Sequence, residues 1–478
     1  MRVVTRADLT LDAVRRVAWE GEAVEIAPEA LAVMDRCHAS FAAFMEARIA
    51  ADPGALIYGV TTAPGDGASV VLSAERAARR PRHLWTAASF GEPLPERVTR
   101  GIVLARLANF LEGHAAVRGE VALAVAGLLD RGPLPAVPAQ ANGGAGEILA
   151  LGHLFLDLSA ELDGGPKERM ALINGSPCAA ALVADAALAG RGRLALTERV
   201  LALAADALGV PLEHYAPDLE ALWGDEHEAA ALRSLRALLA DGAAERQLHQ
   251  APVSFRILPR VLGGTRRAQA EAEAAAGVSL AAVTDNPVYL PPDAERPLGA
   301  VISTGGYHDT RATSAIDGQA VAWADLCQLA QRATDKLLQH PATAALLTPD
   351  EWTLKPLHMV QAGWAEEARE LAQPTLLSLG GFGQNDVPAG SFRAWRKATA
   401  VGERLDAALA GLAALGSQVL HAAGRPAPPA LRPLVDDVRA AFPPVEGPRR
   451  LGDDGAALAG AFGALVLSGA WPVPDIST

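Results

Sequence analysis

The feature that most constrains the fold of this chain is a series of long helical patterns rich in alanine and leucine. Apolar residues recur in these patterns at the three- and four-residue spacing of one helix face. Alanine and leucine are the apolar residues with the highest helix propensity, and aromatic residues make up only 5% of the chain. We therefore predict a mainly α-helical bundle. Its long helices are expected over residues 178–209, 228–243, 265–277, 311–340, 358–373 and 398–422.

The composition is that of an acidic protein with enough apolar residues for a large core. Half of the 478 residues are hydrophobic, and the net charge is −13. No basic cluster indicates nucleic-acid binding, and no stretch reaches the roughly 20 uninterrupted apolar residues of a membrane span. The N-terminal residues lack the apolar core of a signal peptide, so we expect a cytoplasmic protein. Three widely spaced cysteines, Cys37, Cys178 and Cys327, are expected to be reduced and structural.

Segments rich in glycine and proline interrupt the helical patterns. The segments at 57–70 and 132–146 are too punctuated for helix and are predicted to be loops. Proline-rich breaks at 425–434 and 443–448 set off the C-terminal region. We expect three portions: residues 1–195 with the catalytic loops, 196–425 with the central long-helix bundle, and 426–478 with a C-terminal helical and loop region.

Eight short motifs follow one another between residues 8 and 400. They are Tyr-Gly-Val-Thr-Thr at 58–62, Gly-Glu-Pro-Leu-Pro-Glu at 91–96, Val-Arg at 117–118, Ala-Leu-Ile-Asn-Gly at 171–175, Gln-Ala-Pro-Val-Ser-Phe-Arg at 250–256, Thr-Asp-Asn-Pro at 284–287, Gly-Gly-Tyr-His at 305–308 and Gln-Asn-Asp-Val at 384–387. In this order they resemble the motifs of the aromatic amino acid lyases, the histidine, phenylalanine and tyrosine ammonia-lyases. Each motif alone is weak evidence, so the resemblance rests on their order.

The resemblance implies an ammonia-lyase-like fold, in which a long-helix bundle follows an N-terminal portion that bears the catalytic loops. It also implies a small-molecule substrate and a homotetramer, with each active site formed by loops of three subunits. In the family, an Ala-Ser-Gly triplet cyclises and loses water to form an electrophile, methylidene-imidazolone (MIO). This group activates the amino acid for loss of its amine.

The triplet at the matching position departs from the family pattern. It reads Gly144, Ala145 and Gly146. The backbone amides needed for ring closure are present, but alanine has no β-hydroxyl to lose. We therefore expect no MIO and no other cofactor. The glycines before the following helix lack the Lys-Ser/Thr pair of a phosphate-binding loop, and no metal-ligand spacing is present.

Two tyrosines are the candidates for acid/base catalysis. Tyr58 matches the loop tyrosine that serves as acid/base in the family, a role that requires a lowered pKa or a positioned proton; capping of the loop is the structural alternative. Tyr307 replaces a family phenylalanine and is a candidate replacement acid/base. Val253 stands where the family has a second tyrosine, and valine cannot transfer a proton.

The resemblance also assigns candidate substrate-binding residues. Arg256 matches the position that holds the substrate carboxylate, for which a guanidinium fork is suited; a structural ion pair is the alternative. Trp85 falls where the family reads the substrate ring, and it can equally serve core packing. The remaining candidates are polar residues expected near the substrate: Asn174, Thr86, Gln384 and Asn385.

Three functional hypotheses follow from these residues. The first is an MIO-independent enzyme that uses tyrosine acid/base chemistry for elimination, conjugate addition, isomerisation or cyclisation of an activated substrate derived from an amino acid or aromatic acid, with specialised metabolism as a plausible setting. The second is a conventional ammonia-lyase or aminomutase inactivated by replacement of serine with Ala145. The third is a non-catalytic homologue that binds a ligand or partner.

Overall fold

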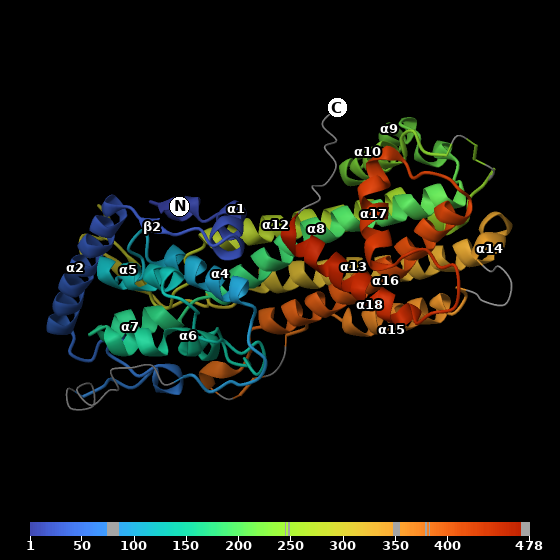
Figure 1. The fold of residues 1–478 in the computed structure, drawn as a ribbon. Coiled ribbons are helices and arrows are strands. Elements are labelled where there is room, and N and C mark those ends of the chain that lie inside the picture. The colour runs from blue at the N-terminus through green and yellow to red at the C-terminus, as the bar shows by residue number, and fades with distance from the viewer. Residues whose placement is uncertain are drawn as a thin grey trace. The chain divides into compact units, whose positions relative to one another are not determined.

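The computed structural model describes residues 1–73, 86–243, 245–246, 249–347, 354–377, 380–381 and 383–469. The fold is mainly helical, as predicted (Figure 1). The long helices are α8 (Pro177–Leu208), α12 (Leu258–Ala281), α13 (Thr310–Gln339) and α16 (Ser391–Ala422), with α10 (Glu226–Leu239) and α15 (Leu357–Leu371). All six expected long helices are therefore present, although α12 and α16 begin seven residues before the ranges expected from periodicity.

The chain divides into two compact units, each assembled from separated stretches of sequence. Unit 1 contains residues 1–185, 272–316 and 375–396, and unit 2 contains 186–271, 317–374 and 397–478. Helices α8, α12, α13 and α16 each have residues in both units. The division into residues 1–195, 196–425 and 426–478 that we expect from the sequence stays a prediction.

Besides its parts of the long helices, unit 1 has the 24-residue helix α2, shorter helices, loops and two small sheets. Strands β1 (Arg2–Val3) and β2 (Glu25–Ile26) are parallel, and β3 (Val288–Leu290) pairs antiparallel with β4 (Ala300–Ile302). Its helical elements are η1 (Arg6–Asp8), α1 (Leu11–Val14), η2 (Arg15–Trp19), α2 (Pro28–Ala51), η3 (Gly65–Gly67), α4 (Glu96–Arg106), η4 (Leu107–Asn109), α5 (Gly119–Gly127), η5 (Leu128–Asp130), α6 (Ile148–Glu161), α7 (Pro166–Ile173) and η7 (Gly383–Asn385).

The core of unit 1 forms around α4. All residues of this helix from Val98 onward are buried except Arg100. α4 packs against η2, α2 packs against α5, and α6 packs against α7. Small alanines and branched aliphatic side chains let these helices approach closely, as in other close-packed interiors. This packing fixes the ends of α4, α6 and α7, from which the candidate site residues extend.

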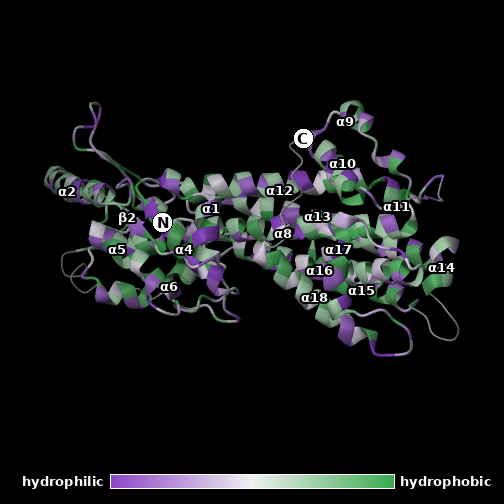
Figure 2. Ribbon diagram, turned by 45° about the horizontal axis from the view of Figure 1, so that its top comes forward, coloured by the Kyte–Doolittle hydropathy of each residue, from purple (hydrophilic) through white to green (hydrophobic). Residues whose placement is uncertain are grey.

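Unit 2 is built from the longer parts of the long helices and from shorter helices. The latter are η6 (Leu212–Tyr215), α9 (Asp218–Trp223), α11 (Val253–Arg256), α14 (Pro341–Leu347), η8 (Pro429–Leu431), α17 (Arg432–Ala441) and α18 (Leu451–Ser468). A buried ion pair joins α8 and α16, with Arg193 Nη2 at 2.9 Å from Asp406 Oδ2. Figure 2 shows hydrophobic and hydrophilic residues interleaved along the helices, as expected when one helix face is buried and another exposed.

Among the described residues, three helical stretches are long and apolar enough to cross a membrane by length and composition alone: Pro166–Leu208, Ser391–Ala422 and Leu451–Ser468. The apolar windows of the first two are 94% and 78% buried inside the protein, whereas that of the third is 17% buried. None of the three is an uninterrupted apolar run of about 20 residues, because each contains charged or polar residues. The three cysteines are buried and free, as predicted.

Candidate functional site

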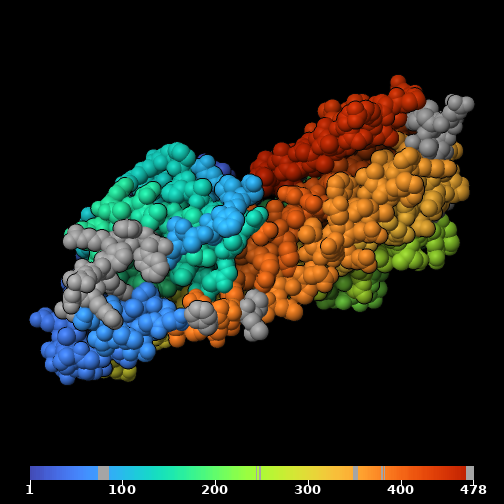
Figure 3. All heavy atoms as spheres, turned by 90° about the horizontal axis from the view of Figure 1, so that it is seen from below, coloured from blue at the N-terminus to red at the C-terminus, as the bar shows by residue number. Residues whose placement is uncertain are grey.

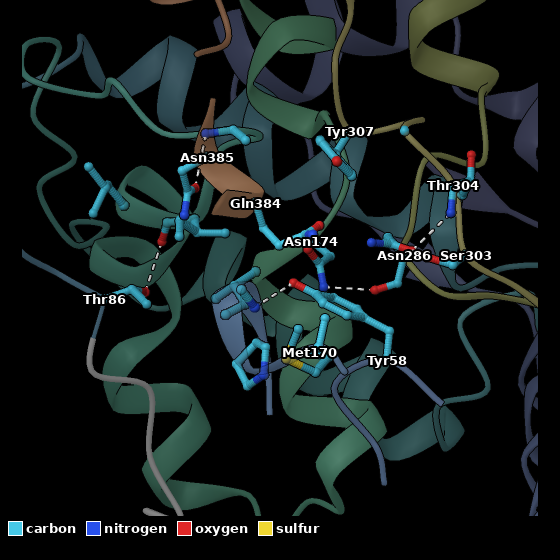
Figure 4. A pocket seen from close by; sticks show the side chains of 18 of the residues that line it. Tyr58, Thr86, Met170, Asn174, Asn286, Ser303, Thr304, Tyr307, Gln384 and Asn385 are labelled. Carbon is cyan, nitrogen blue, oxygen red and sulfur yellow. Dashed lines mark hydrogen bonds between the residues drawn. The ribbon is translucent and has the colours of Figure 1, made fainter. Parts of the chain in front are cut away.

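A cavity of about 720 Å³ lies within unit 1 (Figure 4). Loops that are far apart in the sequence meet around it, and every described residue that lines it is uncharged. The lining residues are Leu56, Tyr58, Pro64, Gly65, Ala68, Thr86, Ala88, Ala145, Ile148, Leu149, Met170, Ile173, Asn174, Asn286, Ser303, Thr304, Gly305, Tyr307, Gln384 and Asn385. Seven of the sequence-predicted site residues are therefore brought together: Tyr58, Tyr307, Asn174, Thr86, Gln384, Asn385 and Ala145.

Two threonines hold the loop that carries Tyr58. The Thr61 hydroxyl accepts a hydrogen bond from Ile57 N at 2.8 Å and donates to Ala55 O at 2.7 Å, while Thr62 Oγ1 accepts from Gly59 N at 3.2 Å. Gly59 has a positive φ of 66°, which favours glycine. A side chain there would also meet Met170, since a Cβ at Gly59 would lie 2.8 Å from Met170 Cγ. The motif at 58–62 thus has a local structural basis.

Tyr58 points its hydroxyl into the cavity, where the oxygen accepts a hydrogen bond from Gly65 N at 3.0 Å (Figure 4). Burial raises the pKa of this phenol, the Gly65 bond opposes the rise, and nearby Tyr307 adds to it. Tyr58 is therefore protonated at neutral pH. Because its oxygen is the acceptor for Gly65, the phenolic hydrogen remains available to another group. Acid/base catalysis by this tyrosine requires either a lowered pKa or a positioned proton. The proton of Tyr58 is positioned, whereas its pKa is raised.

Asn174 and Asn286 form a hydrogen-bonded polar side of the cavity. Asn174 Nδ2 donates to Asn286 O at 2.8 Å, and both side chains are more than nine-tenths buried. The Asn286 Oδ1 atom accepts from Thr304 N at 3.0 Å and from the Ser303 hydroxyl at 3.2 Å. Both amide orientations are therefore fixed by neighbouring groups, and a ligand meets preorganised donors and acceptors.

The loop with Gly144, Ala145 and Gly146 is held by main-chain contacts. Gly144 O accepts from Ala389 N at 3.1 Å, and Ala145 N donates to Asn385 Oδ1 at 3.4 Å. Gly146 has a φ of 76°, and a Cβ there would lie 3.4 Å from the Tyr307 ring. The side chain of Ala145 lines the cavity but is only a methyl group, so it does not supply the hydroxyl from which the MIO methylidene forms.

Thr86 and Gln384 border other parts of the cavity. The Thr86 hydroxyl donates to Ile148 O at 2.8 Å, so its oxygen is left to act as an acceptor. Gln384 N donates to Asp66 Oδ1 at 3.0 Å, and this hydrogen bond joins η7 to η3. The side chain of Gln384 is exposed. In the space-filling view of Figure 3, the orange residues of this segment lie beside the blue loop that follows α2.

One predicted substrate-binding residue, Arg256, is not among the described residues that line the cavity. Arg256 ends α11 in unit 2, next to the exposed Val253, and its Nε atom is buried without a hydrogen-bond partner in the described part of the chain. Trp85 lies outside the described residues. Within the described ranges, no group of three or more histidine, cysteine, aspartate or glutamate side chains is placed to hold a metal ion.

Several lining residues were not predicted from the sequence. Asn286, Ser303, Thr304 and Met170 all contribute side chains to the cavity. Asn286 lies within the motif at 284–287, so the order of motifs was a signal that could have identified it. Ser303, Thr304 and Met170 follow no pattern that sets them apart from ordinary loop or core residues.

The comparisons with known proteins fit this geometry. A family model described as aromatic amino acid lyase matches residues 9–164 and 159–441. The chain belongs to the aromatic amino acid lyase family. The matched residues include the loop that carries Ala145.

Matches to histidine ammonia-lyases cover most of this chain. The histidine ammonia-lyase of Deinococcus radiodurans is 31% identical over 379 residues, which cover 72% of this chain and 70% of the relative. That of Symbiobacterium thermophilum is 29% identical, and the match covers 95% of each chain.

Solved structures share the fold. The ergothionase of Treponema denticola, an ergothioneine-degrading enzyme, has a TM-score of 0.85 at 18% identity, with coverage of 98% of this chain and 99% of that one. The tyrosine aminomutase of Streptomyces globisporus has a TM-score of 0.83 at 22% identity, with 98% of each chain covered. The sequence-based expectation of an ammonia-lyase-like fold is confirmed.

Proposed function

We propose that this chain is a lyase-like enzyme that works without MIO and uses Tyr58 for proton transfer on an activated substrate derived from an amino acid or aromatic acid. The observation that carries the proposal is the composition of one cavity. Ala145 lines it in place of the MIO-forming serine, while Tyr58, Tyr307 and Asn174 line it as well. The acid/base and polar groups are therefore kept together where the electrophile's precursor is missing.

Loss of the electrophile restricts the substrate. The amine of an ordinary amino acid is a poor leaving group, and its β-hydrogen is very weakly acidic. A substrate that carries its own activation removes one of these barriers. A quaternary ammonium group provides such activation, because it leaves as a neutral tertiary amine. The similar fold of an ergothioneine-degrading enzyme is in keeping with a specialised amino-acid-derived substrate.

The elimination balances without any further reactant. The Tyr58 phenolate removes the β-hydrogen, the electrons of that C–H bond form the carbon–carbon double bond, and the neutral amine leaves with the electrons of the C–N bond. In the reverse, addition direction, protonated Tyr58 delivers its hydrogen to the carbon. Since burial keeps Tyr58 protonated at neutral pH, elimination should accelerate as the pH rises toward the pKa of Tyr58.

The other polar residues orient the substrate in this proposal. Asn174 and Tyr307 are positioned to bind its polar groups, and Asn385, Gln384 and Thr86 border the space for its ring or side chain. Arg256 is proposed to hold a carboxylate in a homotetramer whose subunits share active sites, since it does not line the cavity of its own chain.

A turnover assay by mass spectrometry tests the proposal. Purified protein is incubated with L-Phe, L-Tyr and L-His, with the corresponding arylacrylates plus ammonia, and with the trimethylammonium betaines of the same amino acids. We expect conversion of an activated substrate by the wild type, loss of that conversion in Tyr58→Phe, and negligible deamination of the three amino acids. Tyr58-independent conversion would contradict the role of Tyr58, and ligand binding without turnover would favour a non-catalytic homologue.

A second candidate is a conventional ammonia-lyase or aminomutase in which alanine has replaced the cofactor-forming serine. The relatives named histidine ammonia-lyase favour this reading. Ala145→Ser then restores MIO, which is detected by ultraviolet absorbance, a loss of mass from the intact chain and deamination of an amino acid. Our first proposal expects Ala145→Ser to remain without deamination, because Val253 also replaces the second family tyrosine.

A further inference from the structure

Arg106, the last residue of α4, is a fully buried arginine directly behind the cavity wall. Its Nη1 atom donates a hydrogen bond to the main-chain oxygen of Asn174, a residue that lines the cavity. Its Nε and Nη2 atoms are buried and have no hydrogen-bond partner in the described part of the chain. Burial lowers the pKa of this guanidinium, but arginine retains its charge at neutral pH. A buried positive charge therefore lies behind Asn174 without a carboxylate bound to it.

The nearby buried carboxylates are bound to other groups. Asp285 Oδ2 lies 2.6 Å from Lys167 Nζ, and its Oδ1 accepts from Asn286 N at 2.8 Å. Glu147 accepts hydrogen bonds from Cys178 N and Ala179 N, both at 2.6 Å, at the start of α8. Burial raises the pKa of Glu147 to about 8, although these bonds and the charge of Arg106 oppose the rise. At pH 7 Glu147 is mostly neutral, so the four side chains together carry one net positive charge.

The cavity on the other side of Asn174 has no charge of its own among the described residues. A charge acts strongly over short distances in a poorly solvated interior. We propose that Arg106 is a positioning residue that fixes the Asn174 peptide and makes the cavity beside Asn174 selective for an anionic group, a carboxylate of the substrate. This inference deepens the proposed function and rests on it for the identity of the site, but it concerns binding rather than proton transfer.

The selectivity is measured with a matched pair of probes, trans-cinnamate and its neutral amide, trans-cinnamamide, by calorimetric titration at pH 7. We expect the wild type to bind the acid at least about tenfold more tightly than the amide. Arg106→Met should lower this ratio severalfold without weakening the amide, with the remaining preference for the acid supplied by Arg256, and Arg106→Lys should keep most of the wild-type ratio. Arg100→Met is the control, since Arg100 lies on the same helix but donates to Val17 O and Leu129 O. It should leave the ratio unchanged.

A second comparison keeps the inference testable if Arg106→Met does not fold. Between pH 7 and 9 Glu147 gains a negative charge that offsets Arg106, so the wild-type ratio should fall severalfold. The groups that face Glu147 are Arg106 on α4 and Cys178 on α8, and Glu147→Gln should make the ratio independent of pH over this range. A wild-type ratio near one, a ratio unchanged in Arg106→Met, or a ratio that falls equally in Glu147→Gln would overturn the proposal. Because no turnover is measured, inactivity toward every substrate leaves this test intact.

Discussion

A loop that lines the cavity and a buried cluster behind its wall are stabilised in different ways. The Tyr58 loop, residues 55–68, is partly exposed and is held by local hydrogen bonds, both between main-chain groups and between threonine hydroxyls and the main chain. The buried cluster, which consists of Arg106, Glu147, Lys167 and Asp285, is excluded from water and contains an ion pair. The loop presents the reactive group, and the cluster fixes the segments behind it. Substitutions in the loop should therefore affect turnover, whereas substitutions in the cluster should affect stability first.

Tyr58→Phe should give the largest effect in the loop. The phenylalanine keeps the ring but removes the proton that the cavity presents, and positioned acid/base groups contribute about 10²–10⁴-fold to rates. We expect kcat on the true substrate to fall by this factor, with a Tm close to that of the wild type. Steady-state kinetics and a thermal melt measure both quantities. A large drop in Tm would show that Tyr58 is structural. It would contradict the expectation that substitutions in the loop affect turnover rather than stability.

Lys167→Met should give the largest effect in the buried cluster. The lysine is 4% exposed and Asp285 is fully buried, so removal of the lysine leaves an unpaired carboxylate in the interior. Such a change costs roughly 3–5 kcal/mol. Denaturant unfolding should show this loss, and the double variant Lys167→Met/Asp285→Leu should recover much of it. If the single variant is as stable as the wild type, the ion pair does not distinguish the cluster from the loop.

Glu147 should make stability depend on pH. Burial raises its pKa from 4.5 to about 8, so between these values the folded protein holds a proton that the unfolded chain releases. Stability should therefore fall as the pH rises from 5 to 8, by at most roughly 4–5 kcal/mol. Unfolding curves of Glu147→Gln should lack this part of the slope. Equal slopes in the two proteins would mean that Glu147 is not buried as a neutral acid.

Asp66→Ala should have the smallest effect. Asp66 Oδ1 accepts a single hydrogen bond from Gln384 N at an exposed position, and such a bond contributes about 1 kcal/mol. We expect KM to rise a few-fold, with kcat and Tm nearly unchanged. A fall in kcat as large as that of Tyr58→Phe would show that the join between η3 and η7 controls the position of Tyr58.

The sequence predicts much of the fold because helix periodicity reports which residues are buried. All six expected long helices are present, and four of them begin within two residues of the expected position. The starts of α12 and α16 were missed because proline and two glycines interrupt the apolar pattern in the first turns of α12, and three basic residues interrupt it in those of α16. Periodicity did not reveal the two units, because one continuous pattern can contribute residues to both.

For the candidate site, too, some residues were predicted from the sequence and others were not. Motif order identified Tyr58, Asn174 and Ala145, which the cavity brings together. It did not identify Arg106 or Lys167, because a charged residue on a helix is usually exposed, and its burial depends on partners that are distant in the sequence. Lys167 pairs with Asp285, which is 118 residues away in the sequence, and no local pattern predicts such a pair.

The most direct test of the central claim compares L-phenylalanine with its N,N,N-trimethyl betaine, by mass spectrometric detection of cinnamate, ammonia and trimethylamine at pH 7 and 9. We expect the wild type to release no ammonia from phenylalanine. We also expect it to release trimethylamine from the betaine, faster at pH 9 than at pH 7, and we expect Tyr58→Phe to lose this activity. Tyr58-dependent release of ammonia from phenylalanine by the unmodified chain would contradict it.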